Sequence, residues 1–285
     1  MNALVVYKKS TLEFYANSPD KKTADYATLG EEADRLKASD EEQKRTLEAV
    51  VESLEWAGIE HNEIYRAQLD EGIEKSDLVI VVGGDGTLLE TAHYVKKTPI
   101  LGVNSDSANS TGFYSIGNRE NIEKIIETLD NIPRTVLARL ELTLNGEKVK
   151  ELALNDVLIS HQNPAAMTRY KILEEGGFEE YHSSGLLICT ASGSTGFMYN
   201  EDGIVMPLSS TQMQIKHRSI RGSTPYFADA LEIASKTREG LIYIDGAHLQ
   251  YEFGLGDILK IGAGSPLTLI GNLEEKRMKY YAEEM

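Results

Sequence analysis

The segment that most constrains the fold is Leu78–Leu89, LVIVVGGDGTLL, in which an apolar run meets a glycine turn and then a helix-like pattern. The run Leu78–Val82 predicts a strand that is buried on both faces. Glycines in the turn permit unusual backbone angles and let a ligand approach the main chain closely. A helix that begins near Thr87 would point its free N–H groups at this turn. The segment therefore predicts an α/β sheet with a phosphate-binding turn at one strand end.

The sequence around this segment repeats the alternation of strand and helix. Ala3–Tyr7 and Ile100–Val103 are further apolar runs that predict buried strands. Ser39 and Glu42 have the spacing of a capping box and predict that an amphipathic helix begins there. Strands separated by helices indicate a parallel, Rossmann-like sheet, and we expect this α/β domain to span residues 1–132.

The pattern changes near Pro133. Apolar and polar residues alternate over 140–144, and Asn145-Gly146 follows, which is a strong signal for a β-hairpin. Short strand-like segments separated by glycine-containing turns continue to Ile270. We expect residues 133–271 to form an all-β, sandwich-like domain, and the charged tail 272–285 to pack back on the α/β domain.

Composition excludes several classes of protein. The 285 residues carry 45 acidic and 29 basic side chains, a net charge of −16, so the basic stripe that nucleic-acid binding needs is missing. Half of this charge, 14 acids against 6 bases, lies in residues 31–75 and fits a solvated helical surface. The lone Cys189 excludes an internal disulfide framework and a Cys-rich zinc site. No apolar run approaches a membrane span, and no secretory signal is visible, so we expect a cytoplasmic protein without a membrane partner.

Asp85 is the unusual component of the glycine turn, because it adds negative charge where a phosphate would lie. It makes sense as a base or hydrogen-bond acceptor for a hydroxyl, or as a group that helps to hold a metal. The alternative is a tight strand-to-helix turn in which Asp85 is only the N-cap. A P-loop motif and a GxGxxG dinucleotide fingerprint are both missing from the sequence.

Two further segments offer small polar groups. Ser183–Phe197 passes from a strand into a loop rich in hydroxyls and glycine, which leaves room for a flat ring or a phosphate. Asn155 and Asp156 together can grip a ribose diol or an adenine edge. Taken alone, the first segment is more typical of an ordinary loop and the second of a turn.

Together the three segments resemble the NAD kinase family, whose motifs occur in this order: Gly83–Thr87, Asn155-Asp156 and Gly193–Thr195. The resemblance extends from about Leu78 to Ile270, and it is greatest to the branch that contains plant NADH kinase and mitochondrial NAD kinase. This resemblance implies that residues 133–271 bind the dinucleotide and that the active site lies between the two domains. It also implies transfer of a phosphoryl group from ATP, or from polyphosphate, to the adenosine-ribose 2′-hydroxyl of NAD or NADH.

The resemblance assigns roles residue by residue. Asp85 is the matching catalytic residue, and the expected nucleotide-binding residues are Gly83, Gly84, Gly86, Thr87, Asn155, Asp156, His182, Ser184, Ser192, Thr195, Gly196, Phe197 and Asn200. A divalent metal, Mg²⁺ or Mn²⁺, is expected to bind mainly through the nucleotide phosphates. A homodimer or homotetramer is also implied.

Three positions depart from the common family pattern. Ser184 stands where an acid is usual, Phe197 follows Gly196 where Ala-Tyr is usual, and Asp156 replaces Glu. These changes alter the expected dinucleotide contacts. The alternatives are a lipid or sugar kinase that shares the Gly-Gly-Asp-Gly motif, and a dinucleotide-binding sensor without catalysis.

Overall fold

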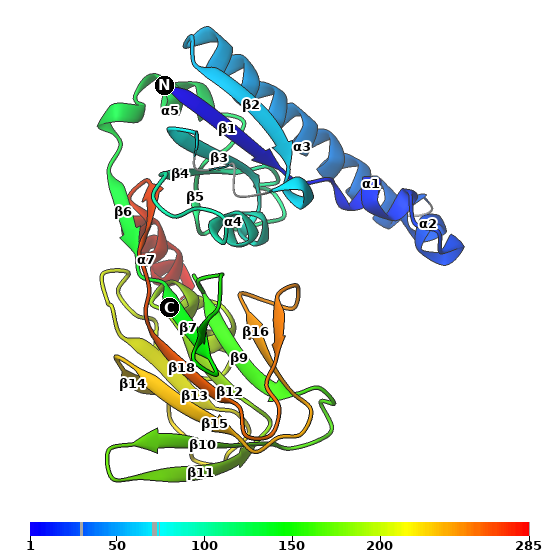
Figure 1. Cartoon of the computed structure of the whole chain (residues 1–285). Coiled ribbons are helices and arrows are strands. Elements are labelled where there is room, and N and C mark those ends of the chain that lie inside the picture. The colour runs from blue at the N-terminus through cyan, green and yellow to red at the C-terminus, as the bar shows by residue number, and fades with distance from the viewer. Residues whose placement is uncertain (29–30, 70–72, 74, 285) are drawn as a thin grey trace. The chain divides into compact units, whose positions relative to one another are not determined.

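The computed structural model describes residues 1–28, 31–69, 73 and 75–284, and it divides the chain into two compact units. Unit 1 comprises Met1–Thr135 and Thr268–Met285, and unit 2 comprises Val136–Leu267. The chain therefore leaves unit 1, builds unit 2 and then returns, so that the last helix belongs to unit 1 (Figure 1).

Unit 1 is built on a seven-stranded sheet with the order β2-β1-β3-β4-β19-β6, and β5 pairs beside β4. Strand β1 pairs in parallel with β2 and β3, and β4 pairs in parallel with β3, β5 and β19. Every residue of β3 and β4 is buried, as their apolar sequences predict. The strands are β1 (Asn2–Tyr7), β2 (Glu60–Tyr65), β3 (Leu78–Gly83), β4 (Ile100–Asn104), β5 (Ser115–Gly117), β6 (Arg134–Leu137) and β19 (Leu267–Ile270).

Helices cover this sheet. Val50 and Leu54 of the long helix α3 and three isoleucines of α5 pack into one cluster with the sheet residues Val5, Ile80 and Val103. These two helices therefore share one face of the sheet. The helices of unit 1 are α1 (Thr11–Ala16), α2 (Lys21–Thr28), α3 (Glu31–Trp56), α4 (Asp85–Ala92), α5 (Ile122–Glu127) and α7 (Leu273–Glu284), with 3-10 turns at Arg66–Gln68 and Leu129–Asn131.

The predicted start of the long helix at Ser39 is wrong, because α3 is already helical from Glu31. Ser39 does not cap the helix; its hydroxyl donates to Asp106 Oδ2 at 2.5 Å. The Glu42 carboxylate likewise does not cap but accepts from Arg119 Nε at 2.8 Å. The first turns bury small or polar side chains such as Ala33 and Asp40, so they show little of the apolar periodicity that marks a helix.

Unit 2 is a sandwich of two six-stranded antiparallel sheets, which confirms the predicted all-β architecture. The strand orders are β11-β10-β15-β18-β7-β8 and β14-β13-β12-β9-β16-β17, and the core lies between the sheets. Asn145 and Gly146 have φ of 53° and 86°, as a two-residue hairpin between β7 and β8 requires. The strands are β7 (Leu140–Leu144), β8 (Glu147–Lys148), β9 (Asp156–His161), β10 (Thr168–Glu174), β11 (Gly177–Ser183), β12 (Leu186–Cys189), β13 (Met213–His217), β14 (Tyr226–Ala228), β15 (Leu231–Ser235), β16 (Gly240–Ile244), β17 (Gln250–Glu252) and β18 (Ile258–Ala263).

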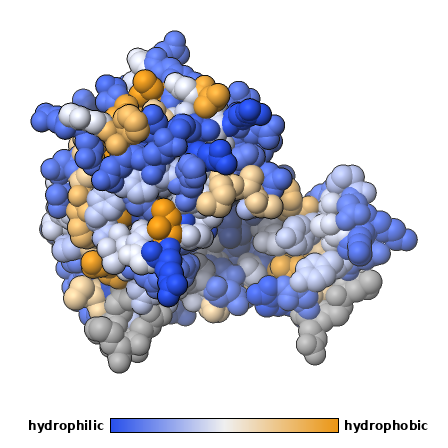
Figure 2. Space-filling view, turned by 90° about the horizontal axis from the view of Figure 1, so that it is seen from below, coloured by the Kyte–Doolittle hydropathy of each residue, from blue (hydrophilic) through white to orange (hydrophobic). Residues whose placement is uncertain are grey.

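Two short helical pieces, the 3-10 turn η4 (Ser192–Thr195) and α6 (Phe197–Asn200), follow β12 in unit 2. The surface agrees with the charge of the sequence, because hydrophilic residues cover most of the face that Figure 2 shows and hydrophobic residues are scattered over it. Among the described residues, none of the helices has the length and apolar character that crossing a membrane requires.

Candidate active site

The glycine turn joins β3 to α4 in unit 1. Strand β3 ends at Gly83, Gly84 is the N-cap, and α4 begins at Asp85. The helix therefore starts two residues before the predicted Thr87, and the alternative in which Asp85 is the N-cap is wrong. A Cβ on Gly83 would lie 2.6 Å from Thr87 Oγ1, so the buried Thr87 requires glycine there. A Cβ on Gly86 would meet nothing within 4 Å, which leaves this part of the main chain open to a ligand.

The Asp85 carboxylate is fixed by the main chain of the loop that follows β4. The N–H of Phe113 donates to Oδ2 and the N–H of Tyr114 donates to Oδ1, each over 3.0 Å. Each oxygen keeps further acceptor capacity, because a carboxylate has about four lone-pair sites. The side chain is thus oriented and is still able to accept a proton or a hydrogen bond.

A polar pocket of about 350 Å³ adjoins Gly84 within unit 1. Burial lowers the pKa of its Lys8, while the nearby Asp106 carboxylate acts in the opposite direction. Arg35, also in this pocket, donates from Nε to Glu32 Oε1 over 3.0 Å. The pocket therefore combines basic groups with acidic partners beside the N-terminal end of α4.

In unit 2 the main chain at the Asn155-Asp156 pair is held by Asp245, a residue that was not among the predicted site residues. One Asp245 oxygen accepts from the N–H of Leu154 at 2.8 Å, and the other accepts from Asn155 at 2.6 Å and from Asp156 at 3.0 Å. Asp245 has a φ of 52°, a conformation that Asp and Asn adopt more readily than most residues. The Asp-Gly dipeptide that directly follows an apolar strand is the signal that could have found it.

The same carboxylate changes the electrostatics of Asp156. Burial, and then repulsion from Asp245, raise the pKa of Asp156 to about 7. Near neutral pH its carboxyl group is therefore partly protonated and can donate as well as accept a hydrogen bond.

The loop after β12 packs directly against the Asn155-Asp156 pair, so the second and third motifs meet. A Cβ on Gly193 would lie 2.0 Å from the Asn155 carbonyl oxygen, so only glycine permits this approach. Thr190 Oγ1 donates to the Leu154 carbonyl at 2.5 Å and accepts from the N–H of Gly193 at 3.2 Å. Ser192 is buried here, and its carbonyl accepts from Thr195 Oγ1 at 3.2 Å.

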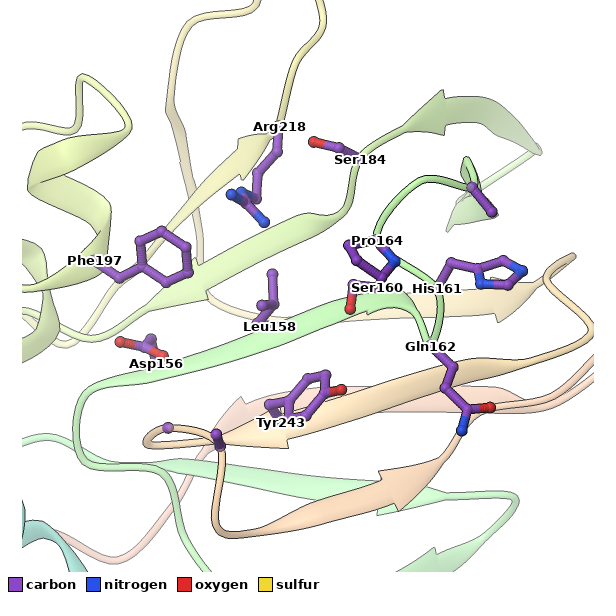
Figure 3. Close-up of a pocket in the computed structure, with 13 residues that line it drawn as sticks. Asp156, Leu158, Ser160, His161, Gln162, Pro164, Ser184, Phe197, Arg218 and Tyr243 are labelled. Carbon is purple, nitrogen blue, oxygen red and sulfur yellow. The ribbon is translucent and has the colours of Figure 1, made fainter. Parts of the chain in front are cut away.

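Asp156, Ser184 and Phe197 line a pocket of about 590 Å³ in unit 2 (Figure 3). Leu158 and Tyr243 add apolar surface to its wall. Arg218, which sequence reasoning missed, lies over the Phe197 ring with Cζ 4.8 Å from its centroid, and it donates from Nε to Glu201 at 2.8 Å. The pocket thus combines a flat apolar wall with a few polar groups, as small-molecule sites do.

The other nucleotide-binding residues predicted in unit 2 do not line this pocket: Asn155, His182, Ser192, Thr195, Gly196 and Asn200. His182 is exposed on β11, where its Nε2 is 3.4 Å from Glu180 Oε1. Asn200 is exposed at the end of α6. Gly196 adjoins the loop, since its Cβ would lie 3.9 Å from Asn155 Nδ2. Within the part of the chain that the structure describes, no three His, Cys, Asp or Glu side chains are grouped to hold a metal ion.

Comparison with known proteins identifies the family. Residues 15–133 match the family model of the ATP-NAD kinase N-terminal domain. The probable NADH kinase of Oryza sativa subsp. japonica is 32% identical over 254 residues, which cover 76% of this chain and 76% of that protein. The NADH kinase of Arabidopsis thaliana is 32% identical over 258 residues, which cover 79% and 81%.

Solved structures share the fold over nearly the whole chain. An NAD kinase from Archaeoglobus fulgidus in complex with ATP has a TM-score of 0.72 at 20% identity and covers 99% of this chain and 98% of its own. Yeast NADH kinase complexed with NADH has a TM-score of 0.71 at 15% identity, with 100% and 87% covered. The predicted fold class and the predicted resemblance to the plant NADH kinase branch are both confirmed. The chain belongs to the NAD kinase family.

Proposed function

We propose that this protein is an NAD(H) kinase that transfers a phosphoryl group from ATP, or from polyphosphate, to the adenosine-ribose 2′-hydroxyl of NAD or NADH. The observation that carries the proposal is the Asp85 carboxylate, fixed by two main-chain N–H groups at the start of α4, in a member of this family. Plant relatives named NADH kinase support the choice of acceptor.

Asp85 acts on the acceptor hydroxyl. As the 2′-oxygen forms its bond to the γ-phosphorus, the bond from that phosphorus to the β–γ bridging oxygen breaks, and the hydroxyl proton passes to a carboxylate oxygen of Asp85. The two N–H donors orient the carboxylate without occupying all of its acceptor sites. A weak base suffices, because positioning and charge neutralisation dominate phosphoryl transfer.

We assign the donor phosphates to the glycine turn of unit 1. Gly84 and Gly86 present main chain there, and the N-terminal end of α4 favours an anion. The basic Lys8 and Arg35 line the adjoining pocket. A divalent ion, Mg²⁺ or Mn²⁺, would neutralise phosphate charge and be held mainly by the phosphates themselves, with few ligands from the chain.

We assign the dinucleotide to the pocket of unit 2 that Asp156, Ser184 and Phe197 line. The Phe197 ring and Leu158 offer a flat apolar wall for adenine, and Asp156 offers a carboxyl group to its polar edge. Asn155, Ser184, Ser192, Thr195 and Gly196 complete the proposed contacts. A homodimer or homotetramer in the cytoplasm is the expected state of the protein.

A direct assay tests the proposal. The full-length protein is incubated with Mg²⁺, with ATP or polyphosphate, and with NAD or NADH, and the 2′-phosphorylated product is separated by ion-exchange chromatography. We expect product with ATP, and the ratio of kcat/KM for NADH and NAD reports the acceptor preference. Absence of product with every pair of donor and acceptor would contradict the proposal, and a parallel panel of lipids and sugars would then identify another acceptor class.

A further inference from the structure

The C-terminal helix α7 reaches the loop that holds Asp85. The Lys276 ammonium donates to the main-chain carbonyls of Thr111 at 3.4 Å, of Gly112, and of Ser115 at 2.6 Å. An ammonium group has three donors, and these three carbonyls flank Phe113 and Tyr114, whose N–H groups bind Asp85. The Lys276 side chain thus contacts both ends of the Thr111–Ser115 segment, whose main chain orients Asp85.

A second contact joins the same helix to the same loop. Tyr280 lies one turn after Lys276 and shares its helix face. Its ring packs edge-on against Phe113, with centroids 4.9 Å apart and an interplanar angle of 77°. The loop therefore meets α7 through a polar anchor and an aromatic one.

The opposite side of the loop is held by the end of β4. Asn104 Nδ2 donates to the Ser110 carbonyl at 2.8 Å. Gly112 has a φ of 56°, and a Cβ there would lie 2.6 Å from Asn104 Nδ2, so the turn is tight. The loop is therefore held by the end of β4 as well as by α7, and both elements restrain the N–H groups of Phe113 and Tyr114.

Lys276 also brings charge to the site. Burial lowers the pKa of its ammonium group, and the negative charge of Asp85 opposes this shift. An apolar side chain of similar length would keep the packing but would leave the Gly112 and Ser115 carbonyls without their ammonium donor.

We propose that Lys276 is a positioning residue, which holds the Thr111–Ser115 loop so that its main chain orients the Asp85 carboxylate. The inference rests on the proposed function for the role of Asp85, and it adds the C-terminal helix to the catalytic apparatus. Because small displacements of an oriented group reduce turnover much more than binding, the effect belongs in kcat.

The kinetic test compares Lys276→Met with Lys279→Met, a matched control on the same helix whose exposed ammonium pairs with Glu275. We expect Lys276→Met to lower kcat about 10- to 100-fold, with KM for the dinucleotide within about twofold of wild type. Lys276→Arg restores donors to the carbonyls and should recover most of this loss. Equal kcat in Lys276→Met and wild type, or an equal loss in Lys279→Met, would overturn the proposal.

The contacts of Lys276 and Tyr280 with the Thr111–Ser115 loop form a clamp on that loop. Hydrogen exchange tests this clamp without any assay of activity. In the peptide that contains residues 111–115, Lys276→Met should exchange its amides about tenfold faster than wild type, and Lys279→Met should not. Tyr280→Leu, which removes the ring from Phe113, gives a second variant if Lys276→Met does not fold. Unchanged exchange in these variants would overturn the clamp even if the wild type is an active kinase. Faster exchange in a protein without turnover would instead retain the clamp and reject the proposed function.

Discussion

The two units use the same device, a carboxylate that accepts main-chain N–H groups, for opposite purposes. In unit 1 the Asp85 carboxylate is the functional group, and the loop at Phe113 and Tyr114 holds it. In unit 2 the Asp245 carboxylate is the holder, and what it fixes is the main chain of the Asn155-Asp156 pair. The role of each aspartate therefore depends on its carboxylate oxygens. Either they serve mainly to hold main-chain N–H groups, or they keep acceptor sites available to a ligand.

The charges around the two carboxylates also differ. Asp85 has the Lys276 ammonium in its neighbourhood. Asp156 faces a second carboxylate, Asp245, and is buried, so its pKa rises to about 7. We expect catalysis in unit 1 to require the negative charge of Asp85. In unit 2 we expect Asp156 to bind the ligand with a carboxyl group that is protonated for part of the time.

The largest expected effect comes from Asp85→Asn. The amide cannot accept the hydroxyl proton, and its NH₂ group would face one of the two N–H donors, so kcat should fall about 10²- to 10⁴-fold. Dinucleotide affinity, measured by calorimetry, should stay within a few-fold, because the proposed dinucleotide contacts lie in unit 2. Glu90→Gln removes one charge from the same helix and should leave kcat near wild type. Unchanged turnover in Asp85→Asn would show that Asp85 is not the base.

The next largest effect is a pH dependence of the free energy of unfolding, which arises from Asp156. Its pKa is about 7 in the folded protein against 3.8 in the unfolded chain, so the folded state binds more protons between these values. The Asp156 contribution therefore makes stability fall as pH rises from about 4 to about 7, by at most about 4 kcal/mol. In Asp156→Asn this contribution disappears, and urea titrations from pH 5.5 to 8 should show the difference. Parallel stability curves for variant and wild type would contradict the raised pKa.

His217, also in unit 2, should make the free energy of unfolding change with pH in the opposite direction. Its ring stacks on Tyr181 with centroids 3.9 Å apart, its Nδ1 is 2.7 Å from Tyr170 Oη, and burial lowers its pKa from 6.5 to about 4. The unfolded chain therefore binds more protons, and stability is lost as pH falls from about 6.5 to about 4, by at most about 3 kcal/mol. His217→Gln should remove this loss, whereas His248→Gln, at an exposed histidine, should retain it. A variant that keeps the acid-side loss would show that another group carries it.

The sequence predicted the architecture well because local pattern and burial coincide there. The apolar β3 and β4 and the Asn145-Gly146 hairpin each have a short-range signal. The predicted start of α3 was wrong because the first turns of this helix bury small and polar side chains in place of a stripe of large apolar ones. The roles of Asp245 and Lys276 depend on main-chain groups about 90 and about 160 residues away. The Asp-Gly dipeptide marks Asp245 as a candidate, but no local pattern encodes the partners of either side chain.

Asp245→Asn tests the two roles of Asp245 in unit 2, which are to hold the main chain and to repel the charge of Asp156. Asparagine tolerates the φ of 52°, but it offers one acceptor oxygen where the carboxylate offers two, so at least one of the three N–H groups loses its partner. We expect the free energy of unfolding at pH 6 to fall by about 1–3 kcal/mol.

The same substitution removes the negative neighbour of Asp156. The pKa of Asp156 should therefore fall below its present value of about 7, and the loss of stability with rising pH should shrink in Asp245→Asn as it does in Asp156→Asn. Asp202→Asn is the matched control, because Asp202 is exposed and also has a positive φ, of 60°. If Asp245→Asn keeps both the stability and the pH slope of the wild type, Asp245 neither holds the main chain nor shifts Asp156. Unit 2 would then not share the device that fixes Asp85 in unit 1.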